Sequence, residues 1–175
     1  MRALISLIGL AALGAASPCG AEVLDSSPSG FTLENKVTVP VDAKTAWRGL
    51  VEHVGDWWPS DHTWWGKAKN LSIDPRAGGC FCEKNGKQQA EHMHVVMVMP
   101  GELLRLKGAL GPLQGMGLDG ALEFRFKQAD DAKSTEITMW FRNGGYTPDD
   151  LSKFVAVVDR VQKQQLGGLK TFLER

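Results

Sequence analysis

Residues 147–175 read TPDDLSKFVAVVDRVQKQQLGGLKTFLER, and this stretch decides the fold. Thr147 is suited to cap a helix, Pro148 to occupy its first position, and the two acids that follow to meet the positive end of its dipole. Apolar side chains then recur on one side, at Leu151, Phe154, Val155, Val158, Val161, Leu166, Leu169, Phe172 and Leu173. The stretch predicts a helix of about 27 residues, roughly 40 Å long, in which Gly167-Gly168 allows close packing or a kink.

The residues before this helix carry the signals of antiparallel strands. Turn residues separate segments that are typical of strands, at 31–39, 71–74, 80–84, 90–99, 103–108, 121–127 and 135–142. Asp42 is expected to cap a short helix at 43–52, and Asn85-Gly86 predicts a two-residue hairpin turn. This order predicts an α+β fold, in which a curved antiparallel sheet of six to seven strands wraps around the long C-terminal helix. Two short helices are expected after the first strand.

The N-terminal residues MRALISLIGLAALGAASPCGA (1–21) predict a cleaved signal peptide. Arg2 precedes an apolar run, small residues follow it, and cleavage is expected after Ala21. The alternative is a lipoprotein acylated at Cys19, against which the preceding proline argues. We therefore expect a periplasmic or secreted protein with a flexible lead-in at 22–30 and a single domain at 31–175.

Composition limits the classes of partner. The chain has 20 basic and 20 acidic residues, and this balance gives no support for nucleic acid as the main partner. After the signal peptide, no stretch is long and apolar enough to span a membrane. A nucleophile motif and a phosphate-binding glycine loop are both absent from the sequence, so no cofactor is expected. A homodimer is left open.

Cys80 and Cys82 lie two residues apart in an expected strand. In extended backbone their Cα atoms would be about 6.7 Å apart, with side chains parallel rather than convergent. That separation is at the upper edge of disulfide geometry, so a bond would require a bent strand. We expect these two cysteines to be reduced or only weakly paired, and a zinc site is disfavoured because a second ligand pair is missing.

Five segments carry a resemblance to a known family: VPVDAKTAW (39–47), DWWPSDHTWW (56–65), PRAGGCFCE (75–83), EHMHVVMVMPGELLRLKGALGPLQGMG (91–117) and GGYTPDDL (144–151). Through them the chain resembles the SRPBCC superfamily of START-like, helix-grip proteins, and within it the polyketide-cyclase-like and heat-shock-ATPase-activator-like branch. The resemblance covers nearly the whole mature domain. It implies an apolar cavity between the sheet and the last helix. It supplies no catalytic residue, because superfamily members include lipid carriers, cyclases and co-chaperones.

Strand parity suggests which side chains face that cavity. Phe124 and Met139 belong to alternating sets, Leu122/Phe124/Phe126 and Ile137/Met139/Phe141, that are expected to face inward as core or cavity wall. Trp140 is expected on the outer face of the sheet.

Glu83 and His92 are the candidates for chemistry. Glu83 shares a strand face with Phe81, and the expected turn places His92 and His94 on that same face. This assignment turns the more apolar set, Met93, Val95, Met97 and Met99, outward, and a bulge would reverse part of it. The resemblance marks Glu83 and His92 as motif positions. They are interpreted as polar side chains that line a pocket, with an acid–base pair or, together with His62, a metal site as alternatives.

Four of the six tryptophans lie at 57–65, around a Pro-Ser-Asp-His turn. These indoles are expected to cover one end of the cavity, where aromatic surface with an N–H suits an amphipathic ligand. Gln114 and Met116, in a glycine-rich loop at 110–120, are expected to close over the mouth. The expected ligand-binding residues are Trp58, His62, Trp65, Phe81, Glu83, His92, Gln114, Met116, Phe124 and Met139.

These observations favour an exported protein that binds a small hydrophobic or aromatic molecule. The first alternative is an enzyme of the cyclase, hydratase or isomerase type with Glu83 and His92 as its acid–base pair. The second is a protein-interaction module that uses the Met-rich strand face or the tryptophan segment.

Overall fold

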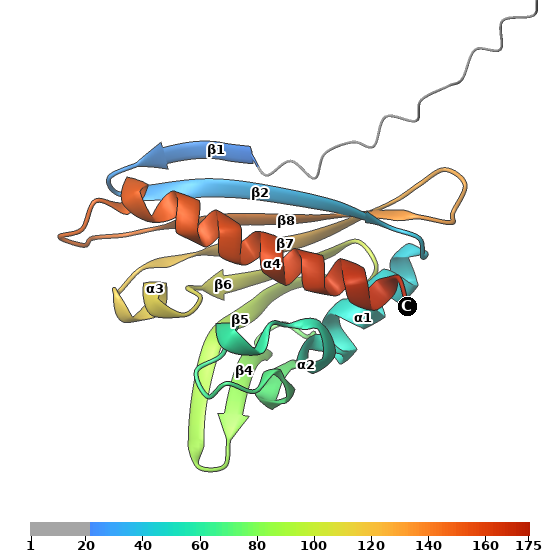
Figure 1. Cartoon of the computed structure of the whole chain (residues 1–175), viewed down its shortest axis with the longest axis horizontal. Coiled ribbons are helices and arrows are strands. Elements are labelled where there is room, and N and C mark those ends of the chain that lie inside the picture. Colours follow the sequence, from blue (N-terminus) through green and yellow to red (C-terminus); the bar gives the residue numbers. More distant parts are fainter. Residues whose placement is uncertain (1–21) are drawn as a thin grey trace, which may run out of the picture.

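The computed structural model describes residues 22–175, so the expected signal peptide lies outside the described residues. Figure 1 shows a long C-terminal helix lying across an antiparallel sheet. The strands are β1 (Glu22–Ser27), β2 (Gly30–Val39), β3 (Leu71–Ile73), β4 (Cys80–Asn85), β5 (Gln88–Met99), β6 (Leu103–Gly108), β7 (Asp119–Gln128) and β8 (Thr135–Gly144). The α-helices are α1 (Ala43–Glu52), α2 (Val54–Trp57), α3 (Pro112–Gly115) and α4 (Val155–Leu173). The 3-10 helices are η1 (Ser60–His62), η2 (Ala68–Asn70) and η3 (Leu151–Phe154).

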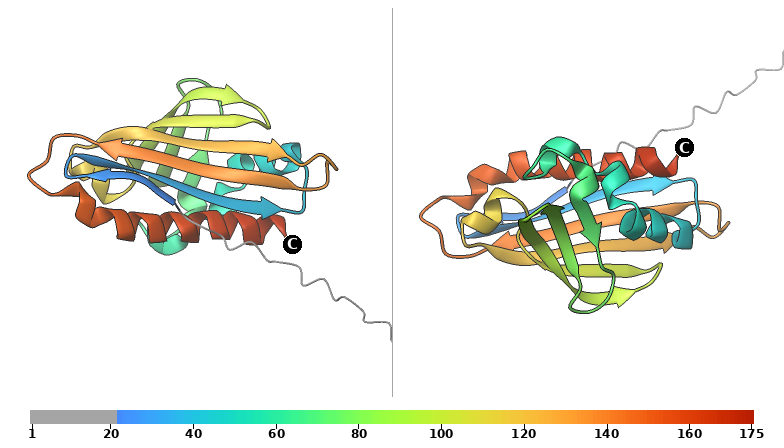
Figure 2. Two further views of the ribbon diagram at one scale, coloured as in Figure 1. Left: turned by 90° about the horizontal axis from the view of Figure 1, so that it is seen from above. Right: turned by 90° about the horizontal axis from the view of Figure 1, so that it is seen from below.

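The eight strands form a single sheet in the order β1-β2-β8-β7-β6-β5-β4-β3. Figure 2 shows α4 running along one face of this sheet, while no helix formed by residues 22–175 covers the far face. The α+β helix-grip architecture expected from the sequence is therefore confirmed, with eight strands in place of six to seven. Within residues 22–175, none of the helices has the length and apolar character needed to cross a membrane.

The additional strand comes from the segment expected to be a flexible lead-in. Residues 22–27 pair with β2, for example Ser26 with Phe31 and Glu22 with Glu34. Nearly every side chain of β1 is exposed. The strand therefore lacks the alternation of buried and exposed residues by which sequence patterns reveal a strand, and backbone pairing alone places it.

The last helix starts later than the cap at Thr147 predicts. The chain from 147 to 150 is not helical, and Asp150 caps η3 by accepting a 3.1 Å hydrogen bond from the Ser152 amide. Leu151 is fully buried, and its N–H donates to the carbonyl of Pro28. The fully buried Leu151 and this bond to the β1–β2 turn hold the start of the helical region, which leaves 19 residues for α4 itself.

The inner face of the sheet and one side of α4 form the core. Leu122, Phe124, Phe126, Ile137, Met139 and Phe141 are all buried, as strand parity predicts. Asp42 caps α1 by accepting a 2.8 Å hydrogen bond from the Thr45 amide, also as expected. Gly168 lies against the carbonyl of Trp57, where a Cβ atom would approach the oxygen to 2.3 Å. Close packing is therefore the reason for a glycine at this position of α4.

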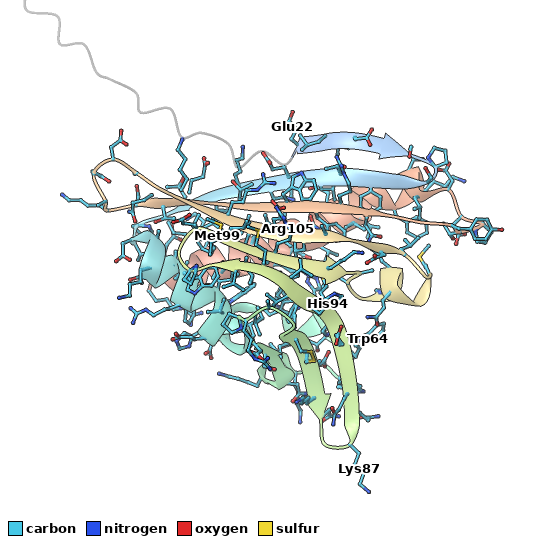
Figure 3. The ribbon with its side chains drawn as sticks, turned by 180° about the vertical axis from the view of Figure 1, so that it is seen from behind. Glu22, Trp64, Lys87, His94, Met99 and Arg105 are labelled. Atoms are coloured by element: carbon cyan, nitrogen blue, oxygen red, sulfur yellow. A yellow bond between two sulfur atoms is a disulfide. The ribbon has the colours of Figure 1, made fainter. Side chains whose placement is uncertain are left out.

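The β4–β5 hairpin turns one residue later than predicted. Asn85 pairs with Gln88, which leaves Gly86 and Lys87 as the turn, and Gly86 has a φ of 62° that glycine adopts without strain. Lys87 marks the tip of this hairpin in Figure 3.

A bulge at His92 decides which side chains of β5 face inward. Phe81 pairs with Met93 and Cys82 pairs with Glu91, so His92 is an extra residue between these pairs. Because of this bulge His92 and Met93 are both buried, and His94 is exposed. The predicted outward position of Met93 and Val95 is wrong for this reason. A second register shift follows between Val95 and Met97, and beyond it Met97 and Met99 are exposed.

Opposite this bulge, Cys80 and Cys82 form a disulfide, with Cα atoms 5.3 Å apart. The expectation that they are reduced is therefore wrong. It assumed extended backbone, whereas β4 is contracted between the two cysteines, where it faces the extra residue of β5.

Candidate functional site

A cavity of about 390 Å³ lies between the sheet and α4. Its walls are mostly apolar and come from five parts of the chain: the tryptophan segment, strand β5, the loop before and within α3, strand β8, and the η3–α4 region. The lining residues include Trp58, Trp64, Leu110, Leu113, Phe141, Phe154, Val157, Val158 and Val161. Polar side chains also reach it, namely Asp61, His62, Thr63, His92, Gln162 and Gln165. The volume lies within the range of small-molecule sites in proteins.

The four clustered tryptophans have different positions. Trp57 and Trp58 are buried, and their indole N–H groups donate to the carbonyls of Gly49 and His62, each at 3.1 Å. Trp58 also lines the cavity, whereas Trp57 belongs to the core alone. Trp64 is 49% exposed and lines the cavity, so it lies at the mouth, while Trp65 is half-buried and is not part of the wall. Two of the four rings therefore face the cavity.

Glu83 holds the tryptophan segment in place from behind. Its carboxylate is completely buried and accepts the backbone N–H groups of Trp64 at 2.9 Å and Trp65 at 3.1 Å. One of the same oxygens, Oε2, lies 3.2 Å from Nε2 of His92. Glu83 is not part of the cavity wall. From this position Glu83 fixes two residues of the wall, because it binds the backbone of Trp64 and the ring of His92.

His92 brings an imidazole to the cavity wall. The side chain is 6% exposed, and burial lowers its pKa below the ordinary value of 6.5, with the hydrogen bond and charge of Glu83 offsetting part of that effect. The ring is therefore neutral at neutral pH. Because Glu83 accepts at Nε2, the proton of the neutral ring is at Nε2 and Nδ1 remains an acceptor. Phe81 lies behind the ring, with centroids 5.4 Å apart.

Three polar side chains of the wall carry buried atoms without a hydrogen-bond partner among the described residues. Gln162 is 1% exposed, and neither its Nε2 nor its Oε1 has a partner. The same holds for Oε1 of the buried Gln165 and for Nδ1 of His62. A buried polar group that lacks a partner costs roughly 1–3 kcal/mol of folding free energy. These atoms are therefore available to a bound molecule.

The structure brings three of the ten expected ligand-binding residues into the cavity wall: Trp58, His62 and His92. Phe81 and Glu83 lie directly behind it, in contact with His92. Phe124 and Met139 are core residues, and Trp65 is half-buried beside the wall. Gln114 is exposed and donates to the carbonyl of Glu91, and Met116 is half-buried, so these two residues do not close the mouth. Leu110, Gly111, Pro112 and Leu113, which precede them in the chain, line the cavity instead.

The helix side of the cavity was missed in the sequence, although a signal existed. Val158, Val161, Gln162 and Gln165 recur at spacings of three and four residues on one side of α4. Two amides on an otherwise apolar stripe, where leucine or valine would be expected, indicate a polar lining. As for the metal alternative, residues 22–175 contain no group of three or more His, Cys, Asp or Glu side chains arranged to hold an ion.

Comparison with known proteins supports the fold. No family model matches the chain, and no curated protein matches it. Among solved structures, it is similar to DynU16 of the dynemicin biosynthetic locus, with a TM-score of 0.58 and 17% identity over 81% of this chain and 46% of that one. It is also similar to CalU16 from Micromonospora echinospora, with a TM-score of 0.54 and 12% identity over 88% of this chain and 86% of that one.

The Aha1 dimer from Colwellia psychrerythraea is a third similar structure, with a TM-score of 0.53 and 13% identity over 82% of this chain and 97% of that one. At these identities the similarity shows the fold. The helix-grip architecture expected from the sequence is thereby confirmed.

Proposed function

We propose that the protein binds a small hydrophobic or aromatic molecule in the cavity between the sheet and α4. The observation that carries this proposal is the cavity itself: about 390 Å³ with mainly apolar walls. Burial of an apolar ligand against such walls contributes about 25 cal/mol for each Å² removed from water. A ligand that replaces solvent here gains this free energy without any rearrangement of the core.

The test uses the two neighbouring tryptophans that differ in position. Trp64→Ala removes a ring that lines the mouth, and we expect it to weaken binding of naphthalene by about 1–3 kcal/mol. Trp65→Ala removes the adjacent ring, which is outside the wall, and is expected to leave the affinity near that of the wild type. Isothermal titration calorimetry measures both. Equal losses for the two variants would mean that the mouth is not where we place it.

Catalysis of the cyclase, hydratase or isomerase type is a second candidate, and His92 is the observation that favours it. Its neutral imidazole borders the cavity with Nδ1 available as an acceptor, while Glu83 orients the ring through Nε2. His92 is then the group that exchanges a proton with the ligand, and Glu83 is a positioning residue. A His92→Gln variant that binds a candidate substrate as tightly as the wild type but loses turnover would support this reading. Unchanged turnover would exclude it.

Export remains part of the proposal, because an apolar run at 3–16 follows Arg2 and precedes small residues. The intact mass of the protein isolated from the producing cell is expected to lack residues 1–21. A full-length product in the cytoplasm would contradict it.

A further inference from the structure

The face that α4 turns to the cavity changes character along its length. Phe154, Val157, Val158 and Val161 make the first part of the wall apolar. Gln162 follows directly after Val161, and Gln165 comes three residues later, almost one helical turn further along. The helix side of the cavity is therefore lined by hydrocarbon from the end of η3 through the first turns of α4, and by two amide groups further along α4.

The unpartnered atoms at that end define a hydrogen-bonding pattern. Gln162 offers a donor group, the NH₂ of Nε2, and an acceptor, Oε1, side by side in a plane, and Gln165 adds a second acceptor. A molecule with a carbonyl acceptor next to an N–H donor, as in a lactam or other cyclic amide, matches the pair of atoms that Gln162 presents. Any further N–H of that molecule is matched by Oε1 of Gln165.

The charged groups of the wall favour a neutral ligand group at this end of the cavity. The lining contains no lysine or arginine, so a buried carboxylate or phosphate would lack a compensating charge. The one lining carboxylate, Asp61, is exposed, and the imidazole of His92 is neutral because burial lowers its pKa. A neutral polar group is the kind that the site can hold.

We propose that Gln162 and Gln165 form a polar subsite for the lactam or cyclic-amide edge of a neutral, otherwise apolar ring system. This inference rests on the proposed binding function and assigns the ligand a class and an orientation. The amide edge lies against the middle of α4, and the apolar body lies against Phe154 and Val157.

The experiment compares bicyclic probes of nearly equal size by calorimetry on the purified protein. Quinolin-2-one carries the lactam edge, its N-methyl derivative lacks the donor, and naphthalene lacks both groups. We expect the wild type to bind quinolin-2-one at least about tenfold more tightly than either of the other two, since unpaired buried polar groups discriminate strongly. Gln162→Leu, which retains the bulk of the side chain, is expected to abolish this preference and to keep the affinity for naphthalene.

Gln164→Leu is the matched control, because Gln164 lies on the same helix and is exposed. It is expected to preserve the preference for quinolin-2-one. Binding of naphthalene without a preference for the lactam, or an unchanged preference in Gln162→Leu, would overturn the subsite and leave the binding function intact. Failure of every probe to bind would overturn both.

Discussion

At the residue scale, the hydrogen bonds of Glu83 indicate a structural role, because three groups bind its carboxylate at once. Its buried carboxylate holds two consecutive backbone amides and one imidazole. The sequence showed Glu83 as an acid beside Phe81 and therefore suggested a cavity residue. What it could not show is that a loop 18 and 19 residues upstream would direct its N–H groups at the carboxylate.

We predict that Glu83→Gln destabilises the fold. An amide side chain offers one oxygen to two N–H donors and turns its own NH₂ toward groups that also donate, so at least one buried donor loses its partner. The expected loss is about 2–3 kcal/mol in the free energy of unfolding, measured by urea denaturation. Glu91→Gln, at an exposed position on β5, is the control. A loss no larger than that of the control would show that the carboxylate does not support the loop.

The lowered pKa of His92 predicts how the free energy of unfolding depends on pH. Burial lowers its pKa in the folded state below the ordinary value of 6.5. The unfolded chain therefore binds a proton first as the pH falls, and stability is lost as the pH moves below about 6.5 toward the folded-state pKa. At higher pH both states are neutral at this residue, and the effect vanishes.

Urea denaturation at pH 7.5 and at pH 5.5 measures this change. Wild type is expected to lose more stability between the two values than His92→Gln does. His94→Gln, which removes an exposed histidine of the same strand, is expected to retain the wild-type loss. Identical pH profiles for wild type and His92→Gln would contradict a lowered pKa.

At the element scale, the sequence predicts the strands well and the irregularities poorly. Alternation of apolar and polar residue types identifies β2, β7 and β8, although Thr32, Glu123 and Thr138 on the polar side are also buried. β1 has no such alternation, and β5 breaks it twice, at His92 and after Val95. Since a bulge reverses the facing of every later residue, the local pattern of β5 cannot be assigned until its pairing with β4 and β6 is known.

The close contact between α4 and α2 gives a matched pair of substitutions. Gly168→Ala would place a Cβ atom 2.3 Å from the Trp57 carbonyl oxygen, while a Cβ atom on Gly167 would meet nothing within 4 Å. We expect Gly168→Ala to destabilise by about 1–3 kcal/mol through overpacking. Gly167→Ala is expected to stabilise by up to about 1 kcal/mol, because alanine favours the helix. Thermal unfolding measures both, and effects of equal sign would contradict the packing.

The disulfide in β4 is predicted to be present in the folded protein as isolated. Thiol counting after unfolding without reductant should find no free group from Cys80 or Cys82, and two after reduction. Because these cysteines flank Phe81, directly opposite the His92 bulge, reduction is also expected to change the chemical environment of the cavity tryptophan Trp58, which packs on Phe81 at 5.2 Å. Two free thiols before reduction would instead show that Cys80 and Cys82 are not bonded to each other.

At the scale of the whole molecule, the fold could be predicted and the site only in part. The final helix, the antiparallel strands and the hairpins are local signals that add up to one architecture. The cavity is different, because its wall combines side chains from the tryptophan segment, β5, β8 and α4, which are distant in sequence. Trp58, His62 and His92 could be predicted as site residues from the sequence, because tryptophan and histidine are residue types that often contact ligands. The signal for Gln162 and Gln165 was weaker, since glutamine on a helix is ordinarily exposed and only their place on an otherwise apolar stripe of α4 marks them.

A ligand site between the sheet and α4 can be tested by calorimetric titration of naphthalene into a variant with a filled cavity. Val158→Trp adds an indole inside the wall, whereas Ala156→Trp adds the same group at an exposed position of the same helix. We predict saturable binding by wild type and Ala156→Trp, and a loss of affinity of about tenfold or more in Val158→Trp, because the volume is occupied. Undiminished binding by a cooperatively folded Val158→Trp would contradict a ligand site between the sheet and α4.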